Sequence, residues 1–305
     1  MLVKIYFVFF LTASIAIAQS NDFGSIKNIK MQGIDSLSTS KATHIETKRL
    51  LLVGIGLAVA NLGIYQPFKN VWWQEERAGF HLYRGYRRTM GYWDFGWYDS
   101  LYGHMDKLGH FYASKLMSEI FTDLSRWVGF NSNSSNVVGP VISFLLMLEI
   151  EIYDSFFKEW GFSLADLTAN GLGAFSPLIG SKLPFLNRFK LKLSYHPTGQ
   201  YQTEKNYIKD YVGMTFWLSY DINSDLPQKV EQYWPDFLNV AIGYSMDRPY
   251  HGDVELYFAP DINWTGISNR KHGLLKSFFK YLDYVHFPCF AWKFTPRSEF
   301  YLLYF

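Results

Sequence analysis

The sequence predicts an α+β protein in which a membrane-associated bundle of about four helices precedes an antiparallel β-sheet or a small open barrel. Between residues 49 and 184, apolar residues recur at helical spacing. After Pro184, apolar and polar residues alternate in several separate runs. Aromatic residues make up 19% of the chain, a composition typical of proteins that meet both apolar and hydrated surroundings. The net charge of +2 gives no indication of a nucleic-acid partner.

The N-terminal residues predict an exported protein. Lys4 supplies a charged start, residues 5–15 form an apolar centre, and residues 16–18 read Ala-Ile-Ala, so we expect a signal peptide over 1–18. An uncleaved anchor helix is the alternative, but the apolar run is short for one. Residues 19–48 are rich in Ser, Thr, Asn and Lys and predict a flexible linker.

The later apolar runs are short or interrupted by Gly, Asn and Glu, which would let the chain pass the inner membrane. We therefore expect the outer membrane or the periplasm, with the inner membrane as the alternative.

Two segments at the start of the bundle indicate contact with lipid. Residues 50–65 form an apolar run that fits a short spanning helix, an interfacial helix or a buried core helix. Residues 71–102 interleave aromatic side chains with arginines, and we expect Arg84, Arg87 and Arg88 to contact lipid phosphates. The alternative for this segment is an aromatic loop with solvated charges. Membrane lipid is thus the predicted partner, and no particular envelope protein is indicated as a second one.

The next helix carries a polar stripe. Residues 106–128 predict a helix that begins Asp-Lys-Leu-Gly-His, with Lys107 beside the first acid. Asp106, His110 and Ser114 are spaced four residues apart, which places all three on one helical face. An acid at the first turn also suits the helix dipole.

Two more helices carry polar residues. After a polar loop at 131–136, residues 137–158 predict an apolar helix with Glu151 and Asp154 near its end. A third helix follows over 163–175.

Within that third helix, Ser163 is the expected N-cap. Asp166 and Asn170 are four residues apart, and Gly171 and Gly173 would permit close helix approach. Short connections favour antiparallel neighbours, so we expect the polar stripes of all three helices to meet in one interior cluster.

Residues 185–305 predict an antiparallel β region with one amphipathic helix at 274–285. Period-two alternation marks the expected strands, which are 189–195, 212–220, 238–244, 253–264 and 298–305. These are too few for a typical closed barrel of eight strands.

Three motifs carry a resemblance to a known family. They are DKLGHFYAS at 106–114, EIYDSFFKEWGFS at 151–163 and DLTANGLGA at 166–174. With looser matches at 209–219 and 238–244, they resemble the predicted periplasmic lipoproteins typified by YfiM, whose activity is not established. A more distant similarity connects the three helices with VanZ-like membrane proteins. This chain departs from the lipoproteins in two respects. Its single cysteine, Cys289, is far from the leader, so the lipid anchor is not carried over, and the downstream match is looser than the helical one.

The resemblance marks eight residues of the polar cluster: Asp106, Lys107, His110, Ser114, Glu151, Asp154, Asp166 and Asn170. We expect these residues to form a buried network in an envelope scaffold protein, because polar groups in an apolar bundle must be paired. A non-catalytic binder of lipid or peptidoglycan fragments is a further alternative.

The other alternative is a hydrolase or transferase acting on an envelope lipid or a cell-wall intermediate. His110 would be the general base, Glu151 and Asp154 would share a proton or a cation, and Asp166 would orient the imidazole. Asp106 completes the catalytic candidates, and the expected substrate-binding residues are Ser114, Asn170 and Lys107. No zinc motif occurs, so no metal or cofactor is predicted, although the carboxylates would suit a divalent, oxygen-preferring cation.

Overall fold

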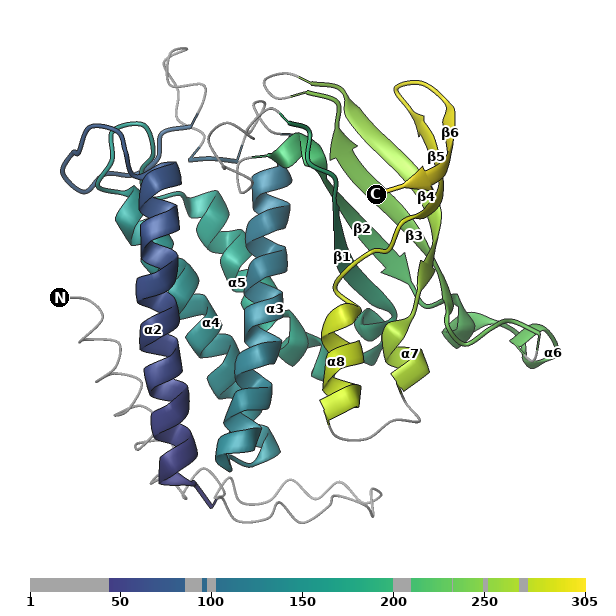
Figure 1. Cartoon of the computed structure of the whole chain (residues 1–305), viewed down its shortest axis with the longest axis horizontal. Helices are drawn as coiled ribbons and strands as arrows, with labels where there is room; N and C mark the ends of the chain where they lie inside the picture. The colour runs from purple at the N-terminus through teal and green to yellow at the C-terminus, as the bar shows by residue number, and fades with distance from the viewer. Residues whose placement is uncertain are drawn as a thin grey trace.

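The computed structural model describes residues 44–85, 95–97, 103–199, 210–231, 233–248, 252–268 and 274–305. The expected signal peptide, most of the expected linker, and Arg87 and Arg88 lie outside the described residues. Four long helices stand on one side of the molecule and a six-stranded sheet on the other (Figure 1).

The long helices are α2 (Thr47–Trp72), α3 (Met105–Val128), α4 (Ser132–Asp154) and α5 (Leu164–Lys182). The strands are β1 (Phe189–Tyr195), β2 (Met214–Tyr220), β3 (Leu238–Met246), β4 (Val254–Ile262), β5 (Cys289–Thr295) and β6 (Glu299–Tyr304). Short helices join them: η2 (Pro184–Arg188), η4 (Tyr211–Gly213), η5 (Ile222–Asp225), α6 (Gln228–Glu231), α7 (Trp264–Ser268) and α8 (Leu274–Leu282). The predicted α+β class is therefore confirmed.

Close approach of backbones holds α3 against α4 and α5. A Cβ on Gly173 of α5 would lie 2.3 Å from the carbonyl oxygen of Phe111 on α3. A Cβ on Gly139 of α4 would lie 2.0 Å from Oγ1 of Thr122, again on α3. Only glycine fits at such approaches, and Gly173 acts here as its sequence context predicted.

Helix α4 differs from its predicted range at both ends. It begins at Ser132 because the Asn131 side chain accepts a hydrogen bond from the amide of Ser134 at 2.8 Å, so the expected polar loop at 131–136 is the cap and first turn of the helix. It ends at Asp154 rather than at 158. The chain beyond it pairs its backbone with residues 76–83 instead, through Ala78 N to Phe156 O at 2.8 Å among others.

Helices α2 and α4 are each long and apolar enough to cross a membrane. Only 12% of the apolar window in α2 is buried against the rest of the described chain, compared with 50% in α4. Helix α2 is thus the more exposed of the two, whereas the half-burial of α4 is also typical of a core helix in a bundle.

The sheet is antiparallel throughout, with the strands side by side in sequence order from β1 to β6. Strands β1 and β6 are its two edges, so the sheet is open. The sheet nevertheless curls. Its curvature brings β2 and β6 close enough for the hydroxyls of Thr215 and Tyr304 to form a hydrogen bond of 3.0 Å.

Strand β5 is absent from the expected strands. Its sequence alternates Phe290, Trp292 and Phe294 with Ala291 and Lys293, and it is the lysine that points into the curl of the sheet and is 9% exposed. The usual rule of apolar residues inside and charged residues outside is reversed there.

Helix α3 connects the two halves of the molecule. Met105 packs against Phe216 of β2 and Met246 of β3 in one buried cluster. The hydroxyl of Tyr244 on β3 donates to the carbonyl of Gly103 at 2.6 Å, just ahead of the same helix. The helix that carries the first polar motif is thus fixed against the sheet.

Candidate functional site

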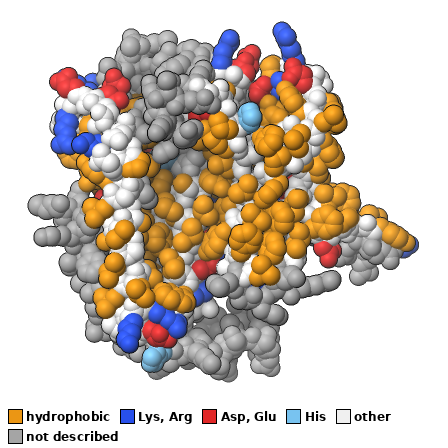
Figure 2. All heavy atoms as spheres, viewed as in Figure 1, with side chains coloured by type: hydrophobic (Ala, Val, Ile, Leu, Met, Phe, Trp, Pro, Cys, Tyr) orange, Lys and Arg blue, Asp and Glu red, His pale blue; other side chains and the backbone are white. Residues whose placement is uncertain are grey.

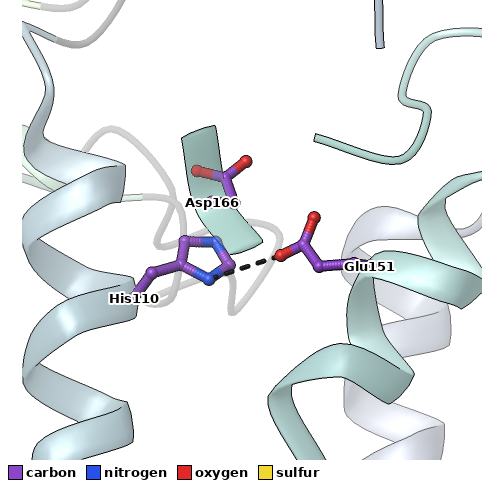
Figure 3. Close-up of side chains that lie close together, drawn as sticks. All are labelled: His110, Glu151 and Asp166. Carbon is purple, nitrogen blue, oxygen red and sulfur yellow. Dashed lines mark ion pairs between the residues drawn. The ribbon is translucent and has the colours of Figure 1, made fainter. Parts of the chain in front are cut away.

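The three polar stripes meet where α3, α4 and α5 pack together. His110 on α3, Glu151 on α4 and Asp166 on α5 point toward one another (Figure 3). The Nδ1 atom of His110 lies 3.6 Å from Oε1 of Glu151, and one ligand atom from each of the three residues lies within 4.8 Å of the other two. The expected convergence of these side chains is present in the structure.

Asn170 is the centre of the hydrogen-bond network. Its Nδ2 donates to Oε1 of Glu151 at 3.2 Å, and its Oδ1 accepts from Ser114 Oγ at 3.2 Å. The same Oδ1 lies 3.0 Å from Nδ1 of His110. Because this oxygen is an acceptor, Nδ1 is the nitrogen that carries the proton in the neutral form of the His110 imidazole. The network therefore sets the imidazole tautomer.

Lys107 forms a double ion pair at the edge of the cluster. Its Nζ lies 2.6 Å from Oδ2 of Asp106 and 2.8 Å from Oδ1 of Asp166. Burial by itself would lower the pKa of Lys107, but the two carboxylates outweigh burial and raise that pKa above its usual value. Lys107 thus stays protonated and joins the starts of α3 and α5.

The two acids of α4 have raised pKa values. Burial raises the pKa of Glu151 well above its usual value, and the charges of Asp166 and Asp154 add to the effect. Burial likewise raises the pKa of Asp154 to about 6, against the hydrogen bond of 2.6 Å that it accepts from Trp73 Nε1. The side chain of Glu151 is only 1% exposed, so it holds a proton at neutral pH more readily than an ordinary glutamate.

Some expected pairings are different in the structure. Asp166 contacts Lys107, so the imidazole of His110 is oriented by Asn170 and Glu151 instead. The cause is the position of Asp166 in the first turn of α5, beside the lysine that starts α3.

Lys158 lies beyond the end of α4 and pairs with Glu76 at 2.6 Å, where both side chains are exposed. Glu149, two residues before Glu151, turns away from the cluster and accepts a hydrogen bond from Asn61 of α2 at 3.0 Å. His104 is exposed at the N-cap position of α3. Among the predicted lipid contacts, Arg84 is exposed.

The cluster has ligand types that could hold a divalent cation, namely one imidazole and two carboxylates from His110, Glu151 and Asp166. The ammonium group of Lys107 already contacts Asp166 and supplies a positive charge at this point. The ligand atoms of His110, Glu151 and Asp166 could therefore bind a proton or an ammonium group as well as a metal ion.

Sequence reasoning missed Trp73. This buried residue follows the last turn of α2, hydrogen-bonds Asp154, and stacks on Tyr153 with the ring centroids 4.8 Å apart. Its neighbourhood is dense in aromatic residues, and nothing in the local pattern distinguishes it from them.

A second polar cluster, also missed, lies inside the curl of the sheet. Lys192 is fully buried and contacts Asp261 at 2.6 Å and Asp283 at 2.7 Å. His286 contacts Asp261 at 2.9 Å, and its Nε2 lies 3.5 Å from Sγ of Cys289. Burial raises the pKa of the Cys289 thiol to about 11, which disfavours the reactive thiolate. The lysines that alternate with leucines in β1 were the available signal for this network.

The fold and site define an α+β protein in which a compact polar cluster on three helices precedes an open, curled antiparallel sheet. Residues 94–180 match the model of a family described as predicted periplasmic lipoprotein (DUF2279). The match spans α3 to α5 and includes all eight residues of the cluster. No curated protein and no solved structure matches this chain.

This match confirms the expected resemblance to predicted periplasmic lipoproteins over the helical motifs. It agrees with an exported protein of the periplasm or the outer membrane and with an envelope protein of unknown function. The looser downstream stretches, at 209–219 and 238–244, lie outside the matched residues.

Proposed function

We propose that the polar cluster is an acid–base site, and that the protein is an envelope hydrolase or transferase acting on a lipid or cell-wall intermediate. One observation carries the proposal: the side chain of His110 is 21% exposed and lies against Glu151, a buried carboxyl with a strongly raised pKa. Perturbed acids beside a solvent-accessible imidazole are characteristic of sites that move protons.

The hydrogen bonds support distinct roles for the members. Asn170 holds the proton on Nδ1 of His110, which leaves Nε2 to take a proton from a water molecule or a substrate hydroxyl. When the imidazole becomes positively charged, the adjacent Glu151 is stabilised in its ionised form. The pair can therefore hold a proton at either group. Lys107 holds Asp106 and Asp166 in fixed positions at the edge of the cluster.

The second candidate is a scaffold, and the completeness of the pairing favours it. Lys107 pairs with two carboxylates, and Asn170 uses both ends of its amide within the cluster. Such a network would fix the register of three helices. However, Glu151 with its raised pKa contributes little to fixing the helices, since apolar residues of similar volume commonly stabilise a buried position as well or better.

The test uses a deletion strain complemented with three variants. His110→Asn and Glu151→Gln change the proton-carrying groups with little change in volume. Glu149→Gln is the matched control, because it alters a buried acid of the same helix outside the cluster. Lipid extracts and peptidoglycan fragments are profiled by mass spectrometry, and protein abundance is measured by immunoblot.

We expect the first two variants to reproduce the deletion profile at normal abundance, while the control restores the wild-type profile. Wild-type profiles for His110→Asn and Glu151→Gln would overturn the acid–base proposal. Loss of abundance in both, with the profile following abundance, would assign the cluster to the scaffold role.

A further inference from the structure

The outer face of the sheet is built with reversed polarity. One apolar residue from each strand stands in register across the whole sheet, in the order Leu191, Leu218, Ile242, Phe258, Trp292 and Phe300. From β2 to β6, these side chains are between 47% and 63% exposed. An uninterrupted exposed row of this kind is unusual on a surface that meets only water.

The opposite face of the same strands is buried and holds charged groups beside an aromatic cluster around Trp217 and Tyr257. Lys192 is 0% exposed and is paired with Asp261, while Ser219 donates to Asp261 at 2.6 Å. Lys293 is paired with Glu255 at 3.1 Å. A sheet in a water-soluble protein normally buries its apolar face, whereas lipid-facing strands alternate apolar outside and polar inside.

The apolar surface continues onto α2. Leu52, Ile55, Val59 and Leu62 recur at three- and four-residue steps and are at least 56% exposed. Figure 2 shows hydrophobic side chains gathered over α2 and over the sheet on the same face, with charged side chains toward its ends. The hydrophobic surface is therefore a wide band across two elements that are far apart in sequence.

Basic residues border this band at both ends. The turns after β3 and β5 lie at one end of the sheet and carry the exposed residues Arg248 and Arg297. At the other end, Arg188 precedes β1, and Arg49 stands in the first turn of α2. Three of these arginines are paired with acids, Arg49 with Glu46, Arg188 with Asp225 and Arg248 with Asp247. Charged side chains of both signs therefore flank the apolar band, where the headgroup layers of a bilayer would lie.

The length of the strands also agrees with the thickness of a lipid bilayer. Strands β3 and β4 have nine residues each, or about 30 Å at the usual rise. At the tilt of membrane strands this corresponds to roughly 21 Å, near the height of an outer-membrane apolar band. We propose that the outer face of the sheet, together with the exposed face of α2, contacts the acyl chains of a lipid bilayer.

A second copy of the chain is the competing occupant. It would cover one compact patch, whereas here the exposed residues extend from α2 to β6 with charges at the two ends. The inference does not rest on the acid–base proposal, because it uses none of the residues of the helical cluster.

The test measures the surroundings of single spin labels on the full chain. In a Cys289→Ser background, a label is attached to Ile242→Cys, in the middle of the band, and separately to Tyr233→Cys. Tyr233 is 82% exposed and lies between η5 and β3, away from the row, so it is the matched exposed control. The protein is reconstituted into vesicles of phosphatidylcholine and phosphatidylglycerol, and collision rates with oxygen and with a water-soluble nickel chelate are recorded.

We expect a several-fold higher ratio of oxygen to nickel collisions at position 242 than at 233, since oxygen concentrates in hydrocarbon and the chelate stays in water. An equal ratio at both positions would show a water-exposed face and overturn the proposal. Low collision rates for both reagents at 242 would show a protein contact, which assigns the face to a second copy. Failure of the chain to associate with the vesicles would also overturn it.

Discussion

Exchange of Gly173 for alanine tests whether the helical site depends on the close approach of α3 and α5. A Cβ there would lie 2.3 Å from the carbonyl oxygen of Phe111 and 2.9 Å from its carbonyl carbon. Both contacts are with backbone, which cannot rotate away, so the helices must separate by about 1 Å. Such overpacking costs roughly 1–3 kcal/mol and occasionally more.

The helix propensity of alanine offsets part of this cost, by about 1 kcal/mol. We therefore expect Gly173→Ala to lower the free energy of unfolding by up to about 2 kcal/mol, which corresponds to a fall in Tm of up to about 3 °C in a chain of this size. The separation also draws Asn170, one turn earlier on α5, away from His110 and Ser114, with which it makes contacts of 3.0 and 3.2 Å.

Gly171→Ala is the matched control on the same helix. Its Cβ would meet Phe144 at 3.6 Å, an ordinary van der Waals distance. This variant should gain up to about 1 kcal/mol from helix propensity, with a Tm up to about 1.5 °C higher. Thermal unfolding is followed by far-UV circular dichroism in one buffer for all three proteins. If Gly173→Ala raises Tm as Gly171→Ala does, the close approach does not constrain the packing of α3 and α5.

Three further changes address the polar networks and a helix cap. Lys192→Met removes the cation that Asp261 and Asp283 share and leaves Asp261 with His286 and Asp283 with Lys190; we expect a loss of about 3 kcal/mol that shrinks at low pH, as urea unfolding would show, whereas the exposed Lys276→Met should stay within about 0.5 kcal/mol. Equal effects of the two lysine changes would contradict the buried pairing. The pKa of Asp154 is about 6 in the folded protein and about 3.9 in an unfolded chain, so the folded state binds more protons between these values and its stability falls as pH rises from about 4 to 6. Asp154→Asn should reduce this fall, to which the raised pKa of Glu151 still contributes, and add about 1 kcal/mol at pH 7, less than the full shift because the side chain is partly exposed; a variant that keeps the wild-type pH slope would refute the assignment. Ser163→Ala removes the N-cap of α5 and should cost about 1 kcal/mol, whereas the exposed Ser181→Ala on the same helix should cost far less, and similar losses would deny the cap its role.

Local pattern was sufficient for much of the fold. The alternation over 189–195 coincides with β1 from its first residue to its last, because a strand with one face in contact with the core must alternate. Ser163 was identified as the cap of α5 by the same kind of local reasoning, since its hydroxyl satisfies an amide of the first turn. The separation of a helical half from a β half likewise followed from the change of period after Pro184.

The candidate site was predictable in membership but not in pairing. Helical spacing placed Asp106, His110 and Ser114 on one face, and the structure brings His110 and Ser114 to the same amide oxygen of Asn170. The ion pair of Asp166 with Lys107 was not predicted, because the distance between side chains on different helices depends on how the helices are rotated against each other. Lys107 competes with the imidazole for that carboxylate, and sequence spacing carries no information on which group is nearer.

The sequence by itself determined where helices and strands form and which polar residues share a helical face, because hydrogen bonds within a helix and the pleat of a strand repeat with fixed periods. Only the tertiary structure decided that Lys192, Lys293 and Asp261 point inward while Trp292 and Phe300 point outward. A period of two assigns residues to two faces without stating which face is covered. The covered face is determined by the direction in which the sheet curls and by helix α3, which packs against one end of the sheet.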